Sequence, residues 1–108
     1  MRIRRDKHEL LDEDVELIAT ISDALAHPVR IRLLKYIMNQ NRSRETVCTK
    51  DLVSASGYAQ ATISQHMKTL LKSGLVEGKK HEKFTYYFVN LGLLMKYVDA
   101  TKKFSVED

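Results

Sequence analysis

The stretch from about Gln60 to Ser73 carries amide, hydroxyl and ammonium side chains at helical spacing. Counted at ~100° per residue, one side of the predicted helix is apolar, with Ile63, Met67, Leu70 and Leu71. Amides can hydrogen-bond base edges in the ~12 Å major groove of DNA, and threonine methyls can contact thymine. The opposite side holds Ala61, Thr62, Gln65, Lys68 and Thr69, with Ser64 at its boundary. A polar side also occurs on any amphipathic helix that faces solvent, so this helix alone leaves both interpretations open.

The segments on either side of this helix favour DNA. A short predicted helix, about Thr49 to Ser56, comes before it and a Gly57-Tyr58 break separates the two. After it, Leu75 to Lys80 and Phe84 to Val89 have the alternation of β-strands around a charged turn. This order is a helix-turn-helix followed by a hairpin wing. Within the wing we expect Lys79, Lys80 and Lys83 to contact phosphate, as His81 could too.

Composition sets the class of protein. The 108 residues suffice for about one domain, so residues 1–108 are predicted to form a single one, with flexible ends at 1–10 and 105–108. Apolar residues make up 44% and charged residues 30%, which excludes a disordered chain. No apolar run approaches the ~20 residues of a membrane span, and the basic start is not a secretory signal. We expect a cytoplasmic protein whose net charge of +4 only mildly favours nucleic acid.

The remaining elements are predicted mostly helical. The first helix runs from about Asp12, as its cap, to Ala26, where His27-Pro28 ends it. The second runs from about Pro28 to Met38 and is apolar over much of its circumference, which predicts a buried helix. A polar loop, 39–44, and a short strand, 46–48, follow, while Asn90 caps a last helix to about Lys103. The fold class is mainly α with a β-hairpin wing: a winged helix-turn-helix with about five helices.

The last helix is apolar on two opposite sides. One side holds Leu91, Leu94, Met95 and Val98. Because a helix with two apolar sides must be covered twice, we infer a symmetric homodimer. The predicted interface comprises four residues on the opposite side of the last helix, Leu93, Tyr97, Ala100 and Phe104. From the first helix and its start it includes Leu17 and Ile21, together with Leu10 and Leu11. The alternative is that the helix lies in a groove of its own domain.

Three segments resemble the ArsR/SmtB-type winged-helix repressors. Residues 24–34, Ala-Leu-Ala-His-Pro-Val-Arg-Ile-Arg-Leu-Leu, are similar to that family's helix-breaking segment. Ile63-Ser-Gln-His-Met67 and Gly74-Leu-Val76 follow in register, and the likeness spans 12–103. The resemblance implies a homodimeric, sequence-specific DNA-binding repressor with residues 79–83 in the wing. By position it places at bases or nearby phosphates Gln60, Ala61, Thr62, Ser64 and Gln65.

Two departures concern the positions of the family pattern. Ala59 stands where the family often has a serine cap, and the loop after the second helix is longer than usual. The family's metal sites also look absent. Cys48 falls at the place of a first thiolate ligand, but the cation of Lys50 holds the place of the second, and no histidine follows His81. We therefore predict no metal and no cofactor.

No catalytic arrangement is visible. Spacing indicates no Ser/His/Asp set, no paired carboxylates and no glycine-rich phosphate loop, so we predict that the protein is not an enzyme. The lone Cys48 is interpreted as a small packed side chain, with a redox- or ligand-released repressor acting through Cys48 as the alternative. The remaining alternative is a winged helix that contacts another protein instead of DNA. The main prediction is a homodimeric repressor that binds an imperfect palindrome in double-stranded DNA.

Overall fold

Five α-helices and one antiparallel hairpin follow one another in the part of the chain that the computed structural model describes, residues 9–105. Their order confirms the predicted winged helix-turn-helix class. No helix among the described residues is long and apolar enough to cross a membrane. The elements are α1 (Asp12–Ala24), α2 (Pro28–Arg42), α3 (Thr49–Ser56), α4 (Gln60–Ser73), β1 (Val76–His81), β2 (Phe84–Val89), α5 (Leu91–Lys102) and the 3-10 turn η1 (Lys103–Ser105).

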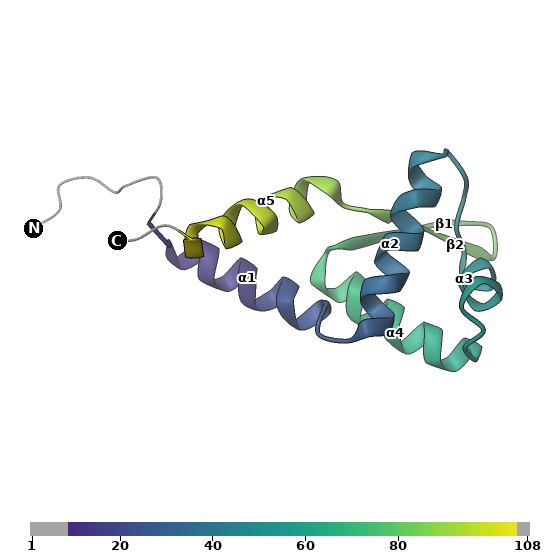
Figure 1. Ribbon diagram of the computed structural model, residues 1–108. Helices are drawn as coiled ribbons and strands as arrows, with labels where there is room; N and C mark the ends of the chain where they lie inside the picture. The colour runs from purple at the N-terminus through teal and green to yellow at the C-terminus, as the bar shows by residue number, and fades with distance from the viewer. Residues whose placement is uncertain (1–8, 106–108) are drawn as a thin grey trace, which may run out of the picture.

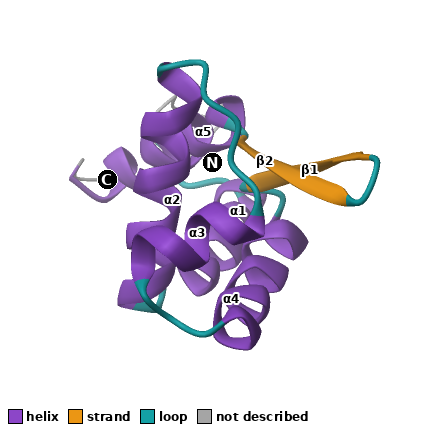
Figure 2. Ribbon diagram, turned by 90° about the vertical axis from the view of Figure 1, so that its right-hand side faces the viewer, coloured by secondary structure: helices purple, strands orange, loops and turns teal. Residues whose placement is uncertain are grey.

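The elements α2, α3, α4 and the hairpin form what we call the body. α2 contributes four buried residues to the body. α3 and α4 lie below the hairpin in Figure 2. The core of the body is aliphatic: Ile37, Leu52, Ile63, Leu70 and Leu75 have no exposed surface. These are the residues that the helical and strand periodicities turn inward, so hydrophobic burial sets the orientation of α4.

The helices α1 and α5 form what we call the arm. They lie side by side and extend away from the body, so that the N- and C-terminal ends of the described chain meet at its far end (Figure 1). There Lys103 Nζ contacts Asp14 Oδ2 at 2.6 Å and donates to the carbonyl oxygen of Glu9 at 3.0 Å. Glu9 and Ser105 of the ends predicted to be flexible lie in the described part, where Glu9 accepts from Lys103 and Ser105 is the last residue of η1. Residues 1–8 and 106–108 of those predicted ends lie outside the described part.

The predicted loop 39–44 is wrong, because α2 continues to Arg42. Asn41 explains the extra turn. Its side-chain amide donates to the carbonyl oxygen of Tyr87 at 3.3 Å and accepts from the backbone N–H of Val89 at 3.0 Å. This contact lies 46 to 48 residues away along the sequence, so the local polarity of the stretch did not reveal it.

Helix ends differ from the prediction by one or two residues. α1 ends at Ala24 rather than Ala26, since Arg30 Nε donates to the Ala24 carbonyl oxygen at 2.7 Å. At its start the cap is Leu11, whose N–H donates to Asp14 at 2.9 Å, and not Asp12. The strand expected at 46–48 is reduced to an isolated bridge between residues 48 and 86. The predicted Asn90 cap is confirmed, because its side chain accepts from the N–H of Leu93 at 3.0 Å.

Candidate nucleic-acid interface

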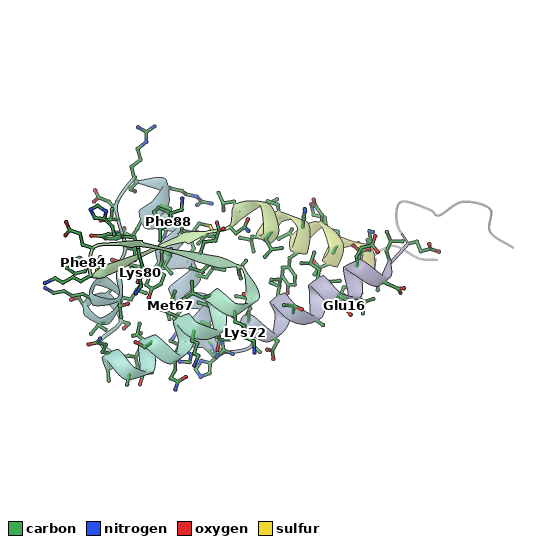
Figure 3. The ribbon with its side chains drawn as sticks, turned by 180° about the vertical axis from the view of Figure 1, so that it is seen from behind. Glu16, Met67, Lys72, Lys80, Phe84 and Phe88 are labelled. Atoms are coloured by element: carbon green, nitrogen blue, oxygen red, sulfur yellow. The ribbon has the colours of Figure 1, made fainter. Side chains whose placement is uncertain are left out.

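The orientation of α4 depends on three side chains. Ile63, Met67 and Leu70 are at most 1% exposed and anchor one side of the helix in the core of the body. Figure 3 shows Met67 turned towards the interior. Because side chains at helical spacing share a face, the opposite side of α4 must face outward. The predicted base- and phosphate-facing residues are all exposed: Gln60, Ala61, Thr62, Ser64, Gln65 and Lys68.

The N-terminus of α4 is open. Ala59 occupies the cap position with extended backbone, and its side chain makes no cap hydrogen bond, as the sequence predicted. The first N–H groups of the helix are therefore free of a side-chain partner. Such groups, with the positive end of the helix dipole, favour an anion such as a phosphate. Gly74 ends the helix with φ 84°, a left-handed conformation that glycine adopts without strain.

The hairpin follows α4 directly and has two different faces. In its register Lys79 pairs with Tyr86, Lys80 with Thr85 and His81 with Phe84. Since side chains alternate along a strand, Lys79 and His81 share a face with Phe84, Tyr86 and Phe88 of β2. The Lys79 ammonium lies 5.3 Å from the centroid of the Phe88 ring on that face. Lys80 is on the opposite face.

The face that carries Lys80 is the one that approaches α4. A Cβ added at Gly78, on this same face, would lie 3.1 Å from Thr85 and 3.4 Å from Leu71 of α4. The absence of a side chain at Gly78 thus allows the hairpin to pack closely on the helix. All four predicted wing residues are exposed. Because side chains alternate along β1, however, they do not all lie on one face of the hairpin, and the sequence-based prediction did not separate them. Lys80 is on the α4 side of the hairpin, whereas Lys79 and His81 are on the other.

Sequence reasoning also missed functional candidates on α4 itself. Lys72 is exposed one turn beyond the exposed Lys68, on the same side of the helix. The spacing of four residues was visible in the sequence and could have indicated it. The half-buried His66 lies at the edge of α4, and its ring contacts Arg30 of α2.

The comparisons with known proteins agree on one family. Residues 25–79, just over half of the chain, match the family model of a helix-turn-helix domain. The transcriptional repressor SmtB of Mycobacterium tuberculosis is 34% identical over 79 residues, which cover 73% of this chain and 52% of that protein. The cadmium resistance regulatory protein CadC of Listeria innocua is 22% identical over 106 residues, 98% of this chain and 86% of that one.

A solved structure supports the same fold. The homodimeric winged helix-turn-helix DNA-binding domain from Mycobacterium bovis is similar with a TM-score of 0.66 at 18% identity, covering 94% of this chain and 88% of that one. The chain belongs to the ArsR/SmtB family of winged helix-turn-helix transcriptional regulators. It is thus a DNA-binding transcriptional regulator, and its relatives are regulators and not enzymes.

Within the described part of this ArsR/SmtB-type regulator, the side chains do not form the family's metal-ligand sets. Cys48 is buried at the start of α3, and its thiol donates to Asp51 Oδ2 at 3.3 Å. The same carboxylate oxygen accepts the N–H of Cys48 at 2.9 Å, so Asp51 acts as a helix cap. No group of three or more His, Cys, Asp or Glu side chains within residues 9–105 could hold a metal ion. The residues present do not fit a family metal site.

The predicted interface side of α5 is partly covered by its own protomer. Leu93 and Tyr97 pack on the core of their own protomer, and the Tyr97 hydroxyl lies 3.1 Å from Ser22 Oγ of α1. Ile21 and Ala100 are 0% and 3% exposed, and therefore have no surface for a partner. Leu17 is half-buried against the same core. Of the predicted interface set, Phe104 and Leu10 are exposed, at 68% and 40%, and Leu17, Leu93 and Tyr97 are half-buried.

The exposed apolar side chains of the arm are others. Leu91 and Met95 on α5 are 50% and 52% exposed, and Val15 on α1 is 50% exposed. Leu10, at 40%, was among the residues expected at the seam. On α5 the exposed apolar residues Leu91 and Met95 therefore lie opposite to the predicted side, while Leu10 and Phe104 of the predicted set are exposed as well.

Proposed function

We propose that this regulator is a cytoplasmic, single-domain repressor that binds an imperfect palindrome as a homodimer. Each subunit inserts α4 into a major groove while its hairpin follows the neighbouring phosphate backbone. The observation that carries the proposal is the outward side of α4. It presents Gln65 and Lys68 beside the small Ala61, so that the helix backbone can approach base edges closely.

The uncovered side of the arm supports the homodimer. Leu91, Met95 and Val15 stay exposed to water, and apolar surface of this kind marks interaction sites. A second copy of the same arm supplies a matching apolar surface under two-fold symmetry. The similar domain of Mycobacterium bovis is homodimeric, which favours the same state here. Two symmetric copies of α4 would in turn require two half-sites in the DNA.

The rival function is a winged helix that contacts a protein. Protein interfaces are enriched in aromatic residues and depleted in lysine. The outward side of α4 has the reverse composition: Gln60, Gln65, Lys68 and Lys72 without an aromatic residue. The arrangement of α4 therefore favours DNA over a protein partner.

Release through Cys48 is the remaining alternative within the DNA-binding class. The thiol is 9% exposed and already donates to Asp51, which favours a packing role. Reactive thiols are usually accessible and lie beside positive charge. We propose that Cys48 is structural.

The test separates base reading from phosphate binding. The probe is a duplex selected by the wild-type protein from a randomised library, with a scrambled duplex beside it. Gln65→Ala should weaken binding to the selected duplex by roughly 1–3 kcal/mol and leave the scrambled duplex nearly unaffected. Lys80→Ala should weaken both duplexes alike and reduce the slope of log affinity against log salt by about one unit per subunit.

Lys79→Ala is the matched control for Lys80→Ala. It removes the same charge from the neighbouring position, on the hairpin face turned away from α4, and should change the salt slope less. Equal losses on both duplexes for Gln65→Ala would show that α4 does not read sequence. If no variant weakened binding, or no duplex could be selected, the protein-contact function would replace the proposed one.

A further inference from the structure

The side of α4 next to α2 carries a cluster that the proposed DNA contacts do not use. His66 of α4 lies with its Nδ1 atom 3.3 Å from Arg30 Nη1 of α2. The ring of His27, the cap residue of α2, is 4.6 Å from the His66 ring, centroid to centroid, at an angle of 52°. His66 is half-buried, so this cluster forms part of the packing that holds the DNA-facing helix.

Arg30 connects the cluster to the arm. Its Nε donates to the carbonyl oxygen of Ala24 at 2.7 Å, and its Nη2 donates to that of Asp23 at 3.4 Å. Both carbonyls belong to the last turn of α1. One guanidinium group thus joins the end of the proposed dimerisation arm to the middle of α4. A planar group with several donors in a fixed geometry suits such a junction, and a lysine would not replace it.

The contact determines the protonation of His66. A guanidinium has donors only, so Nδ1 of His66 must be the acceptor and must carry no proton. The proton of the neutral ring is then on Nε2. His27 is held in the same way, because its Nδ1 accepts from the N–H of Val29 at 3.2 Å. A doubly protonated His66 would have no acceptor for Arg30 and would add a second cation beside it.

We propose that Arg30 and His66 are positioning residues that fix α4 relative to the arm, and that they do so only while His66 is neutral. Protonation of His66 opens the contact, releases α4 from its DNA-reading orientation and lowers the preference for the selected duplex over other DNA. The inference rests on the proposed function, since α4 must be the helix that reads DNA.

The surroundings of His66 agree with a ring that stays neutral near pH 7. Burial lowers the pKa of His66 below its usual 6.5, and the neighbouring His27 and Arg30 lower it further. From α2 these two are the groups that face the ring. From α1, Asp23 offers Arg30 its backbone carbonyl, and on α4 itself Lys68 and Lys72 lie on the outward side. No carboxylate among the described residues forms an ion pair with His66.

The test is the pH dependence of specificity. The affinity ratio between selected and scrambled duplexes is measured at pH 7.5 and pH 5.5. Simple charge predicts stronger binding to any DNA in acid, because protonated histidines attract phosphate. The proposed contact predicts that the ratio falls in acid, by no more than about tenfold per subunit, because the pKa of His66 lies below 6.5.

Two variants sharpen this test. His66→Asn keeps an acceptor close to the place of Nδ1 and cannot be protonated, so its ratio should stay constant between the two pH values. His81→Asn, in the exposed wing, removes a histidine that has no part in the contact and should keep the fall of the wild type. A wild-type ratio that does not fall, or the same fall in His66→Asn, would overturn the proposal.

Nitrogen-15 NMR of the imidazoles tests the contact without DNA. We expect His66 as the Nε2–H form with a pKa below 6.5, and a higher pKa in Arg30→Gln, which removes the neighbouring positive charge. An Nδ1–H form would refute the Arg30–His66 contact whatever the protein binds. The NMR result can be as expected while no duplex can be selected. In that case the proposed function fails, and so does the role of the contact in DNA reading. The Arg30–His66 contact itself would still be established.

Discussion

The body and the arm differ in how much of their own apolar surface they bury. Eight of the nine large side chains that are less than 2% exposed lie in the body, and Ile21 alone comes from the arm. Of the eight large apolar residues that are exposed in the described part of the chain, five lie on the arm or at its end and three on the body: Leu10, Val15, Leu91, Met95 and Phe104 against Ile31, Tyr58 and Phe84. Glu16 on the arm and Phe84 at the tip of the hairpin mark the opposite ends of the molecule (Figure 3).

This difference separates two tasks. The body buries enough apolar surface against itself to hold α4 and the hairpin in a fixed geometry. The arm leaves apolar side chains exposed, and in the proposed homodimer it would set how far apart two bodies lie on DNA. Stability should therefore depend mainly on the body, and assembly on the arm.

The largest effect is expected from a cavity in the body. Leu70→Ala removes a side chain with no exposed surface, and should lower the free energy of unfolding by about 2–5 kcal/mol because the cavity cannot fully collapse. Urea unfolding followed by circular dichroism measures it. Ile31→Ala, at a residue of α2 that is 51% exposed, is the control and should cost less than about 1 kcal/mol. Similar losses for both variants would contradict the assignment of the core.

The second prediction concerns the uncovered side of the arm. Leu91→Glu together with Met95→Glu places charges at exposed positions, so the protomer should keep its helical content but sediment as a monomer. Loss of the linked second half-site should lower affinity for the selected duplex by about a hundredfold.

The control for this experiment is Lys96→Glu, which alters an exposed charged position on the same helix and should leave the dimer intact. Leu93→Glu with Tyr97→Glu should instead unfold the arm, because these side chains pack on their own protomer. If the Leu93 and Tyr97 variant were a folded monomer while the Leu91 and Met95 variant stayed a dimer, the interface would lie on the side of α5 that the sequence predicted.

A smaller effect is expected at the far end of the arm. Hydrogen bonding from Lys103, and then from the Leu11 N–H, lowers the pKa of Asp14 below its usual 3.8. Its stabilising contribution is therefore present above pH 3.8 and lost as the pH falls through the lowered pKa. Asp14→Asn should lower the Tm at pH 7, and the difference from the wild type should vanish in strong acid. Asp12→Asn, at an exposed position of the same turn, should lack this pattern.

The smallest effect is expected at Cys48. Serine can donate to Asp51 as the thiol does, so Cys48→Ser should change the free energy of unfolding by no more than about 1 kcal/mol. DNA affinity of the wild type should be equal with reductant and with peroxide. Release of DNA by peroxide in the wild type but not in Cys48→Ser would establish the redox alternative instead.

The body was largely predictable from the sequence because its signals are local. The periodicity of α4 identified Ile63, Met67 and Leu70 as inward-facing, and β2 was predicted with its observed bounds. The caps at Asn90 and Gly74 depend on residues within a few positions of the helix ends. Local chemistry of this kind does not require knowledge of the rest of the fold.

What the sequence could not show depends on contacts between distant segments. A helix that is apolar on two sides does not indicate which side packs on its own protomer. The burial of Ala100 and the contact of Tyr97 with α1 show which side of α5 does so. The separation of Lys79 from Lys80 follows from the hairpin register, which was within reach of the pattern. The junction at Arg30 joins three helices, and no spacing in the sequence predicts that geometry.

The hydrogen bonds between the Asn41 side chain and the backbone of β2 have a consequence for solubility. A two-stranded hairpin with Phe84, Tyr86 and Phe88 could recruit a strand from another chain through its open edges and begin an aggregate. On β2 that edge is occupied, since Asn41 contacts both Tyr87 and Val89 and the Val47 carbonyl oxygen accepts the N–H of Tyr87 at 2.8 Å. The edge of β1 carries charged residues from Glu77 to Lys80, which discourage a like strand. The extra turn of α2 thus shields the aromatic hairpin from fibrous association at high protein concentration.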